Sequence, residues 1–183
     1  MNILSELLGG QNKSAVRSVA NQFGISENEV QTGLAGLLPS LMNGMKQNAS
    51  NEDGERALLD AIKNGNHSRY LEDGDHFARQ ETIDDGNGIL GHLFGSKERS
   101  REVASQASAA TGLSSTILKK LLPIAATMIM GSLGKNMAGG LLSSVLGGGG
   151  GQSQKAGGLL GFLDFDNDGS VADDIFNIAR KFF

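Results

Sequence analysis

The chain has 183 residues and a formal net charge of −4, and 39% of its residues are hydrophobic although only 5% are aromatic. This length allows one or two small domains, and the absence of cysteine excludes disulfide bonds, thiol catalysis and cysteine-based zinc sites. Valine, threonine and aromatic residues alternate in no segment, so the sequence predicts an all-α protein.

The segments before residue 50 read as three helices. A short helix is predicted over residues 3–8 and a second over residues 13–23, which Gly24 ends. A long helix follows Ser26, because Ser26 and Glu29 have the spacing of a capping box. Pro39 lies inside this helix, so we expect a kink or a break there.

Residues 48–54 are predicted as a polar loop and residues 55–63 as a helix. Residues 72–88 are acidic, contain glycine and show little periodicity, so we predict a boundary there, with an acidic connector over residues 76–88. Residues 49–88 carry ten acids and four bases, whereas residues 89–146 carry six bases and two acids.

The second half of the chain repeats the pattern of the first. A Gly-Leu-Ser run at residue 112 and a Leu-Leu-Pro run ending at Pro123 match Gly-Ile-Ser at Gly24 and Leu-Leu-Pro at Pro39. The glycine-to-proline spacing differs by four residues, close to one turn of about 3.6 residues, so the buried face stays in phase. We therefore predict two related helical units, residues 1–75 and 89–146. General similarity among small apolar helices remains the alternative.

The glycine-linked helix pairs also fit a helix-turn-helix, with a small residue at Ala20, a turn at Gly24 and an apolar residue at Val30. The first unit carries Glu27 and Glu29 on its second helix, and these would repel phosphate. The second unit is the better candidate for nucleic acid, because it is basic at Lys97, Arg99, Arg101, Lys119 and Lys120. Such helix pairs are also common as plain packing units.

The remaining segments are a stretch of small and large apolar residues over 137–146, a glycine-rich linker over 147–158, and an aspartate-rich loop with a helix over 159–183. The first stretch suggests close helix packing or self-association. The last contains oxygen ligands at alternate positions, as an EF-hand loop does, with Gly169 at the turn. The predicted calcium ligands are Asp164, Asp166, Asp168, Ser170, Asp173 and Asp174.

The loop departs from the EF-hand pattern at position 12, where Ile175 replaces the bidentate glutamate, so Asp173 or Asp174 must close the site. The alternative is an aspartate-rich turn whose last acids cap the following helix.

Catalysis has little support. His67, His76 and His92 lack metal-ligand spacing, and no nucleophile motif is present, so we do not expect an enzyme.

Three motifs resemble a known family: residues 89–95 (ILGHLFG), residues 112–114 (GLS) and residues 121–125 (LLPIA). They are similar to those of the bacterial domain of unknown function 937 group, which includes the YidB-like proteins, over residues 1–146. The resemblance implies an all-helical fold with homeodomain-like units, and the tail resembles the acidic tail of some members. It implies no activity and no catalytic residues.

Together these features predict a non-enzymatic bacterial binding or scaffolding protein that self-associates and binds calcium at its tail. The alternative is a weak nucleic-acid-binding protein that uses the basic second unit. The amino-terminal residues show no signal-peptide pattern. The longest apolar run, residues 121–133, is shorter than the about 20 residues that cross a bilayer. We therefore expect a cytoplasmic protein with no membrane span.

Overall fold

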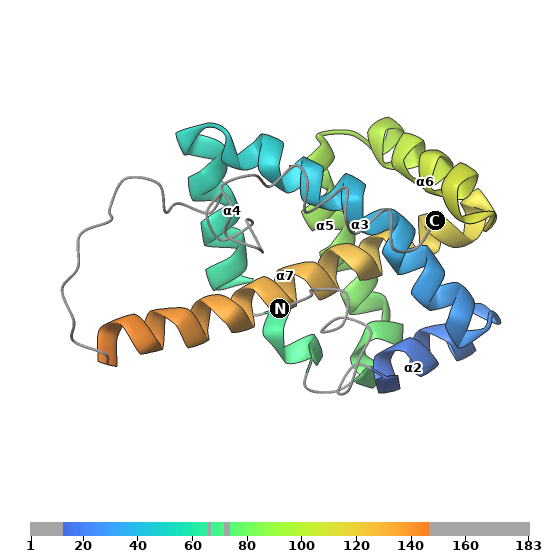
Figure 1. The fold of residues 1–183 in the computed structure, drawn as a ribbon, viewed down its shortest axis with the longest axis horizontal. Helices are drawn as coiled ribbons and strands as arrows, with labels where there is room; N and C mark the ends of the chain where they lie inside the picture. Colours follow the sequence, from blue (N-terminus) through green and yellow to red (C-terminus); the bar gives the residue numbers. More distant parts are fainter. Residues whose placement is uncertain (1–12, 66, 72–73, 147–183) are drawn as a thin grey trace.

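The computed structural model describes residues 13–65, 67–71 and 74–146, and these residues form helices joined by short turns, with no strand among them. The predicted all-α class is therefore confirmed for this part of the chain. The elements in order are α2 (Lys13–Phe23), α3 (Glu27–Ala49), α4 (Glu52–Asn64), η2 (His67–Leu71), η3 (Gly74–Ala78), α5 (Gln80–Phe94), α6 (Lys97–Thr111) and α7 (Ser115–Leu146), shown in Figure 1.

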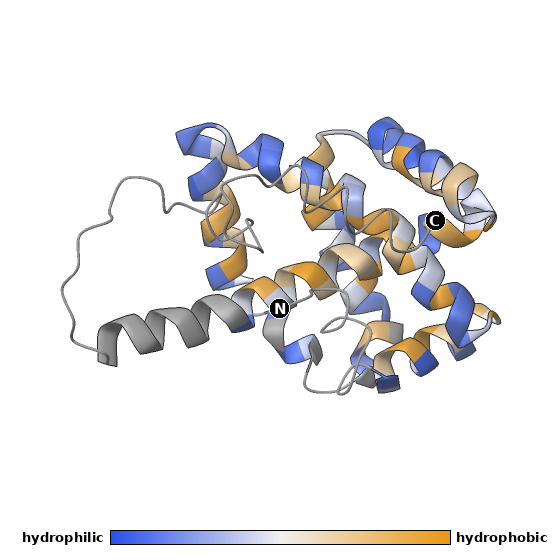
Figure 2. Ribbon diagram, in the orientation of Figure 1, coloured by the Kyte–Doolittle hydropathy of each residue, from blue (hydrophilic) through white to orange (hydrophobic). Residues whose placement is uncertain are grey.

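Helix α7 is the element against which most of the others pack. It crosses the molecule in Figure 1, and α3, α4, α5, α6 and η2 all contact it. Every residue from Leu121 to Leu133 is buried, as expected for a helix that is apolar on all sides. Figure 2 shows this hydrophobic middle of α7, in contrast to the predominantly polar outer surface of α6. One hydrophobic core includes Leu41 of α3 and Ile124 of α7, so both predicted units contribute to it.

The segment Ser115–Lys135 of α7 is long and apolar enough to cross a membrane by length and composition. It exceeds the run of residues 121–133 because it includes more polar residues on both sides. Within the fold, 78% of its most apolar window is buried against other parts of the protein. A core helix of a globular protein has this property, and it is the role that α7 has in this structure.

Two tight turns connect α2 to α3 and α6 to α7. Gly24 and Gly112 have φ angles of 67° and 74°, in the left-handed region that side chains disfavour. At the first turn the Ser26 hydroxyl accepts a hydrogen bond from the backbone N–H of Glu29 at 3.2 Å, and the Ser26 N–H donates to the Glu29 carboxylate at 2.8 Å. The predicted capping box is therefore confirmed. At the second turn the Ser114 hydroxyl accepts from the N–H of Ile117 at 3.3 Å.

Residues 76–88, which were predicted as an acidic connector, are partly helical, since α5 begins at Gln80 within them. Gly86 and Gly88 weakened the apolar periodicity, but Gly86 has a packing role. A Cβ at this position would lie 2.1 Å from the carbonyl oxygen of Pro123, so only glycine lets the backbones of α5 and α7 approach this closely. The acidic stretch is thus partly a core-facing helix.

Two further expectations need correction. The polar loop predicted over residues 48–54 is shorter, because α4 starts at Glu52, where the Asn51 side chain accepts from the N–H of Gly54 at 2.8 Å. Of the kink or break expected at Pro39, the break does not occur, because α3 continues to Ala49. The neighbouring Leu38 and Leu41 are buried, so packing offsets the about 3 kcal/mol that an interior proline costs.

Candidate anion-binding groove

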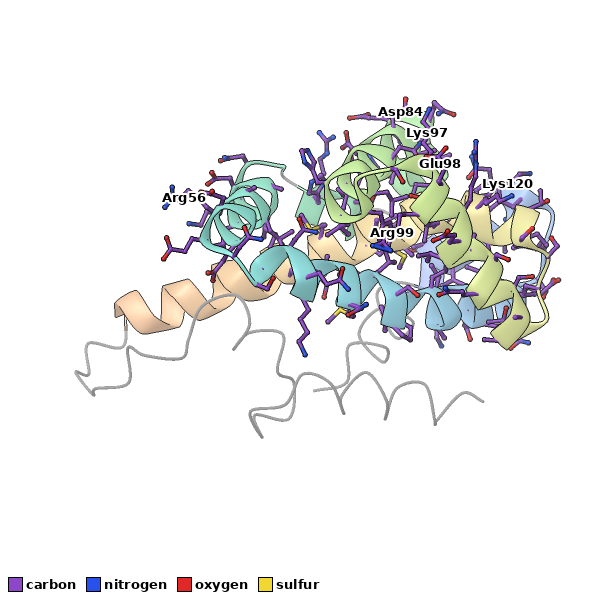
Figure 3. The ribbon with its side chains drawn as sticks, turned by 90° about the horizontal axis from the view of Figure 1, so that it is seen from above. Arg56, Asp84, Lys97, Glu98, Arg99 and Lys120 are labelled. Atoms are coloured by element: carbon purple, nitrogen blue, oxygen red, sulfur yellow. The ribbon has the colours of Figure 1, made fainter. Side chains whose placement is uncertain are left out.

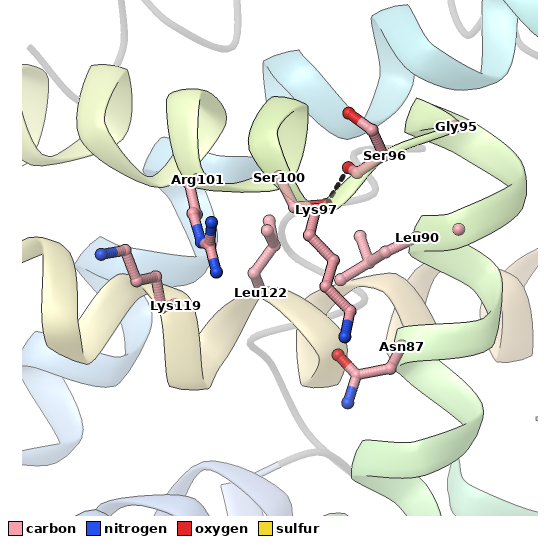
Figure 4. Close-up of a pocket in the computed structure, with 10 residues that line it drawn as sticks. Asn87, Leu90, Gly95, Ser96, Lys97, Ser100, Arg101, Lys119 and Leu122 are labelled. Carbon is pink, nitrogen blue, oxygen red and sulfur yellow. Dashed lines mark hydrogen bonds between the residues drawn. The ribbon is translucent and has the colours of Figure 1, made fainter.

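A groove with a volume of about 620 Å³ opens between α5, α6 and α7. Leu90 and Leu122 contribute apolar surface to it, while Lys97 and Arg101 reach it from α6 and Lys119 from α7 (Figure 4). None of the described residues that line it is acidic. The groove therefore combines three cations and some apolar surface in one place.

The sequence places these cations through helix geometry. Lys97 and Arg101 are four residues apart, so they lie on the same side of α6, at the edge of the face that Ala104 and Ala107 bury toward the core. On α7 the buried neighbours of Lys119 fix the helix and leave the lysine exposed. All three cationic residues are exposed to solvent.

Figure 4 shows how the side chains lie. The side chain of Arg101 extends from α6 toward α7, that of Lys119 lies beside it on α7 with its amino group turned away from Arg101, and the side chain of Lys97 extends toward Asn87 on α5. Like charges held together on rigid helices produce a positive potential that attracts anions. No acidic side chain among the described lining residues neutralises these cations, so their attraction for an external anion is not reduced within the groove.

The amino-terminal end of α6 adds to this potential. Gly95, with a φ of 71°, ends α5, and the Ser96 hydroxyl caps α6 by accepting from the N–H of Arg99 at 3.2 Å. The Ser100 hydroxyl donates to the carbonyl oxygen of Ser96 at 3.3 Å (Figure 4). The first turn of a helix carries a partial positive charge, so this edge of the groove also favours anions.

Acidic residues near the groove reduce its positive electrostatic potential only in part. Arg101 Nη1 lies 3.5 Å from Glu98 Oε1, but both side chains are more than half exposed, so water and salt screen the pair. Glu102 is the other acid of α6. Residues 97–120 carry five bases and two acids, which leaves a net charge of +3 on the two helices that flank the groove.

Of the basic residues singled out from the sequence, the structure brings Lys97, Arg101 and Lys119 together. Arg99 does not line the groove. Lys120 lies elsewhere around α7, with its Nζ 5.6 Å from the centre of the Phe23 ring of α2. The sequence reading missed Asn87, because it lies on the helix that was taken for a connector.

A second polar cluster fastens η2 to α5. The hydroxyl of Tyr70 donates a hydrogen bond to Asp85, and Arg69 Nη2 lies 2.6 Å from that hydroxyl and 2.7 Å from Glu81 Oε1. Burial, together with the hydrogen bond to Asp85, raises the pKa of Tyr70. The phenol therefore keeps its proton, and the cluster acts as a structural tie.

Two of the histidines that looked scattered in the sequence meet at this cluster. The rings of His67 and His76 lie 6.2 Å and 6.3 Å from that of Tyr70. Burial lowers the pKa of His67, and its Nδ1 has no hydrogen-bond partner in the described structure. Across the described residues, no group of three or more His, Asp or Glu side chains is placed to hold a metal ion. Nothing in the sequence spacing indicated this convergence.

The predicted calcium ligands lie outside the described residues, so that site stays a prediction from the sequence. They are Asp164, Asp166, Asp168, Ser170, Asp173 and Asp174. The predicted glycine-rich linker also lies outside the described residues.

Comparison with known families gives one match. The family described as "Bacterial protein of unknown function (DUF937)" matches residues 5–136, which include α2 to α6 and the groove. Neither a curated protein nor a solved structure matches the chain.

Proposed function

The chain belongs to the DUF937 family of bacterial proteins of unknown function, and for this member we propose a non-enzymatic role in which the groove between α5, α6 and α7 binds the phosphate backbone of nucleic acid. The observation that carries the proposal is the convergence of Lys97, Arg101 and Lys119 on one groove without an acid among its described lining residues.

Phosphate contacts provide most of the sequence-independent affinity of nucleic-acid-binding proteins. The cations that supply such contacts need to be exposed, close to each other and held by rigid elements. Lys97 and Arg101 meet these conditions because α6 packs on α3 and α7 through its buried alanines. Lys119 does so because its neighbours Leu118 and Leu121 are completely buried.

The same groove gives no support to catalysis. Its polar lining consists of Asn87, serines, two lysines and an arginine, without a histidine or carboxylate among the described lining residues to pair with a nucleophile. A binding role in the bacterial cytoplasm, where nucleic acid is abundant, fits this chemistry.

The proposal is tested by retention of the full-length protein on immobilised mixed-sequence DNA at low ionic strength. Arg101→Gln/Lys119→Gln is expected to elute early, whereas the matched control Arg56→Gln/Lys63→Gln also loses two charges and is expected to elute with the wild type. The control residues lie on α4, and Figure 3 shows Arg56 far from Lys120. Equal elution of both variants, or no retention of the wild type, would reject the role of the groove.

A second candidate is a scaffolding role through self-association, because α7 continues to Leu146 and extends beyond the other helices in Figure 1. Light scattering over a concentration series tests it, and a monomer at every concentration would exclude it.

Calcium binding at the tail would accompany this role. Calorimetric titration of the wild type and of Asp166→Ala with calcium tests that site, with uptake expected only in the wild type.

A further inference from the structure

The first two turns of α7 form an exposed end on a firmly held helix. Ser114, which directly precedes α7, is exposed, and so are Thr116, Lys119 and Lys120 within it. Leu118, between them, is completely buried in the core. This end can therefore meet a partner without any rearrangement of the fold.

Cations stand on both flanks of this end. Lys119 faces the groove shared with Arg101 of α6. Lys120 is the next residue, about 100° further around α7, and its Nζ lies 5.6 Å from the centre of the Phe23 ring on α2. The major groove of DNA is about 12 Å wide, admits an α-helix and has phosphates along both edges. A helix end with a cation on each flank matches that geometry.

The chemistry of the end favours phosphate as well. The first turn of α7 contains no acid, whereas the first turn of α3 contains Glu27 and Glu29. The exposed hydroxyls of Ser114 and Thr116 and the positive end of the helix dipole can both approach phosphate oxygens. The α6–α7 pair is therefore suited to a polyanion, and the α2–α3 pair is not.

The types of residue in the groove and at the end of α7 indicate whether the nucleic-acid partner is duplex or single-stranded. Single-strand binding relies on aromatic side chains that stack on bases, and the described lining of the groove contains none. The side chains that form two-point contacts with base edges most specifically, the arginine fork and the asparagine and glutamine amides, are absent from residues 114–120, whose lysines and hydroxyls can contact phosphate as well as bases. From these observations we propose that the groove's partner is duplex DNA, bound without sequence preference, with the end of α7 in the major groove. This inference rests on the function proposed above.

Fluorescence anisotropy with the full-length protein tests it. The probes are a labelled 20-base-pair duplex of mixed sequence and the matching single strand, and vesicles of anionic lipid serve as the alternative surface. We expect the duplex to bind at least about tenfold more tightly than the single strand, because the duplex places phosphates on both flanks of α7.

The decisive variant is Thr116→Glu, which puts a negative charge at the end of α7. We expect about tenfold or greater loss of duplex affinity with an unchanged or higher Tm, because an acid in the first turn of a helix is favourable for folding. Thr116→Ser is the matched control and should bind as the wild type does. Lys120→Gln is a second variant, and it should weaken duplex binding without lowering Tm.

These outcomes distinguish failure of the duplex-binding mode from failure of phosphate binding by the groove. Equal or tighter binding of the single strand, or unchanged duplex binding by Thr116→Glu, overturns the duplex mode and leaves the groove as a general phosphate site. Binding to neither nucleic acid at 50 mM salt or below overturns the proposed function itself. Binding to the vesicles alone does so too.

Discussion

Removal of one groove cation should change the salt dependence of DNA binding by a calculable amount. If Lys97, Arg101, Lys119 and Lys120 each neutralise one phosphate, the slope of log K against log salt concentration is about −3.6, from about 0.9 per contact. Binding then weakens roughly 150-fold between 50 and 200 mM salt. In Lys119→Gln the slope should be about −2.7, and the same change of salt should weaken binding only roughly 40-fold.

The assay is a set of anisotropy titrations of a labelled duplex at four salt concentrations, with Lys63→Gln on α4 as the control for loss of a single charge. The control should weaken binding little and keep the wild-type slope, since Lys63 lies outside the groove. A slope that Lys119→Gln leaves unchanged would show that Lys119 contacts no phosphate, and the reasoning from groove geometry would be refuted.

Other predictions concern the fold. Gly86→Ala should cost about 1–3 kcal/mol, because its Cβ would clash with the backbone of Pro123. A Cβ at Gly88 would meet open space, so Gly88→Ala should stabilise the fold by up to about 1 kcal/mol. If both substitutions changed the free energy of unfolding equally in chemical denaturation, the packing argument for Gly86 would be contradicted. Because burial lowers the pKa of His67 below 6.5, stability should fall as pH drops below 6.5 through the lowered pKa, and His67→Gln should flatten this fall in urea melts at pH 7.5 to 5.5.

The parts of the fold that depend on local signals could be predicted from the sequence. The capping box of Ser26 and Glu29 and the turn at Gly24 involve residues within a few positions of one another, and the structure has them as expected. The start of α5 could not be predicted, because the need for glycine at position 86 is set by Pro123, far along the chain. Likewise, the sequence left a kink and a break open at Pro39, and only the burial of its neighbours shows why α3 continues.

In the candidate site, too, local features could be predicted from the sequence, whereas the tertiary arrangement could not. The basic character of Lys97, Arg101 and Lys119 was visible in the sequence, because composition and helical spacing are local properties. Their convergence depends on how α5, α6 and α7 cross, and the sequence gives no direct measure of that crossing. The meeting of His67 and His76 at Tyr70 was hidden for the same reason.

DNA binding by the groove and the end of α7 can be mapped by nuclear magnetic resonance of the isotope-labelled full-length protein, titrated with a 20-base-pair duplex at low salt. We expect the largest changes in amide shifts in residues 95–101 and 114–120, at the groove and the end of α7, and little change in residues 52–64 of α4. Changes centred on α4, or no changes at any DNA concentration, would contradict this expectation.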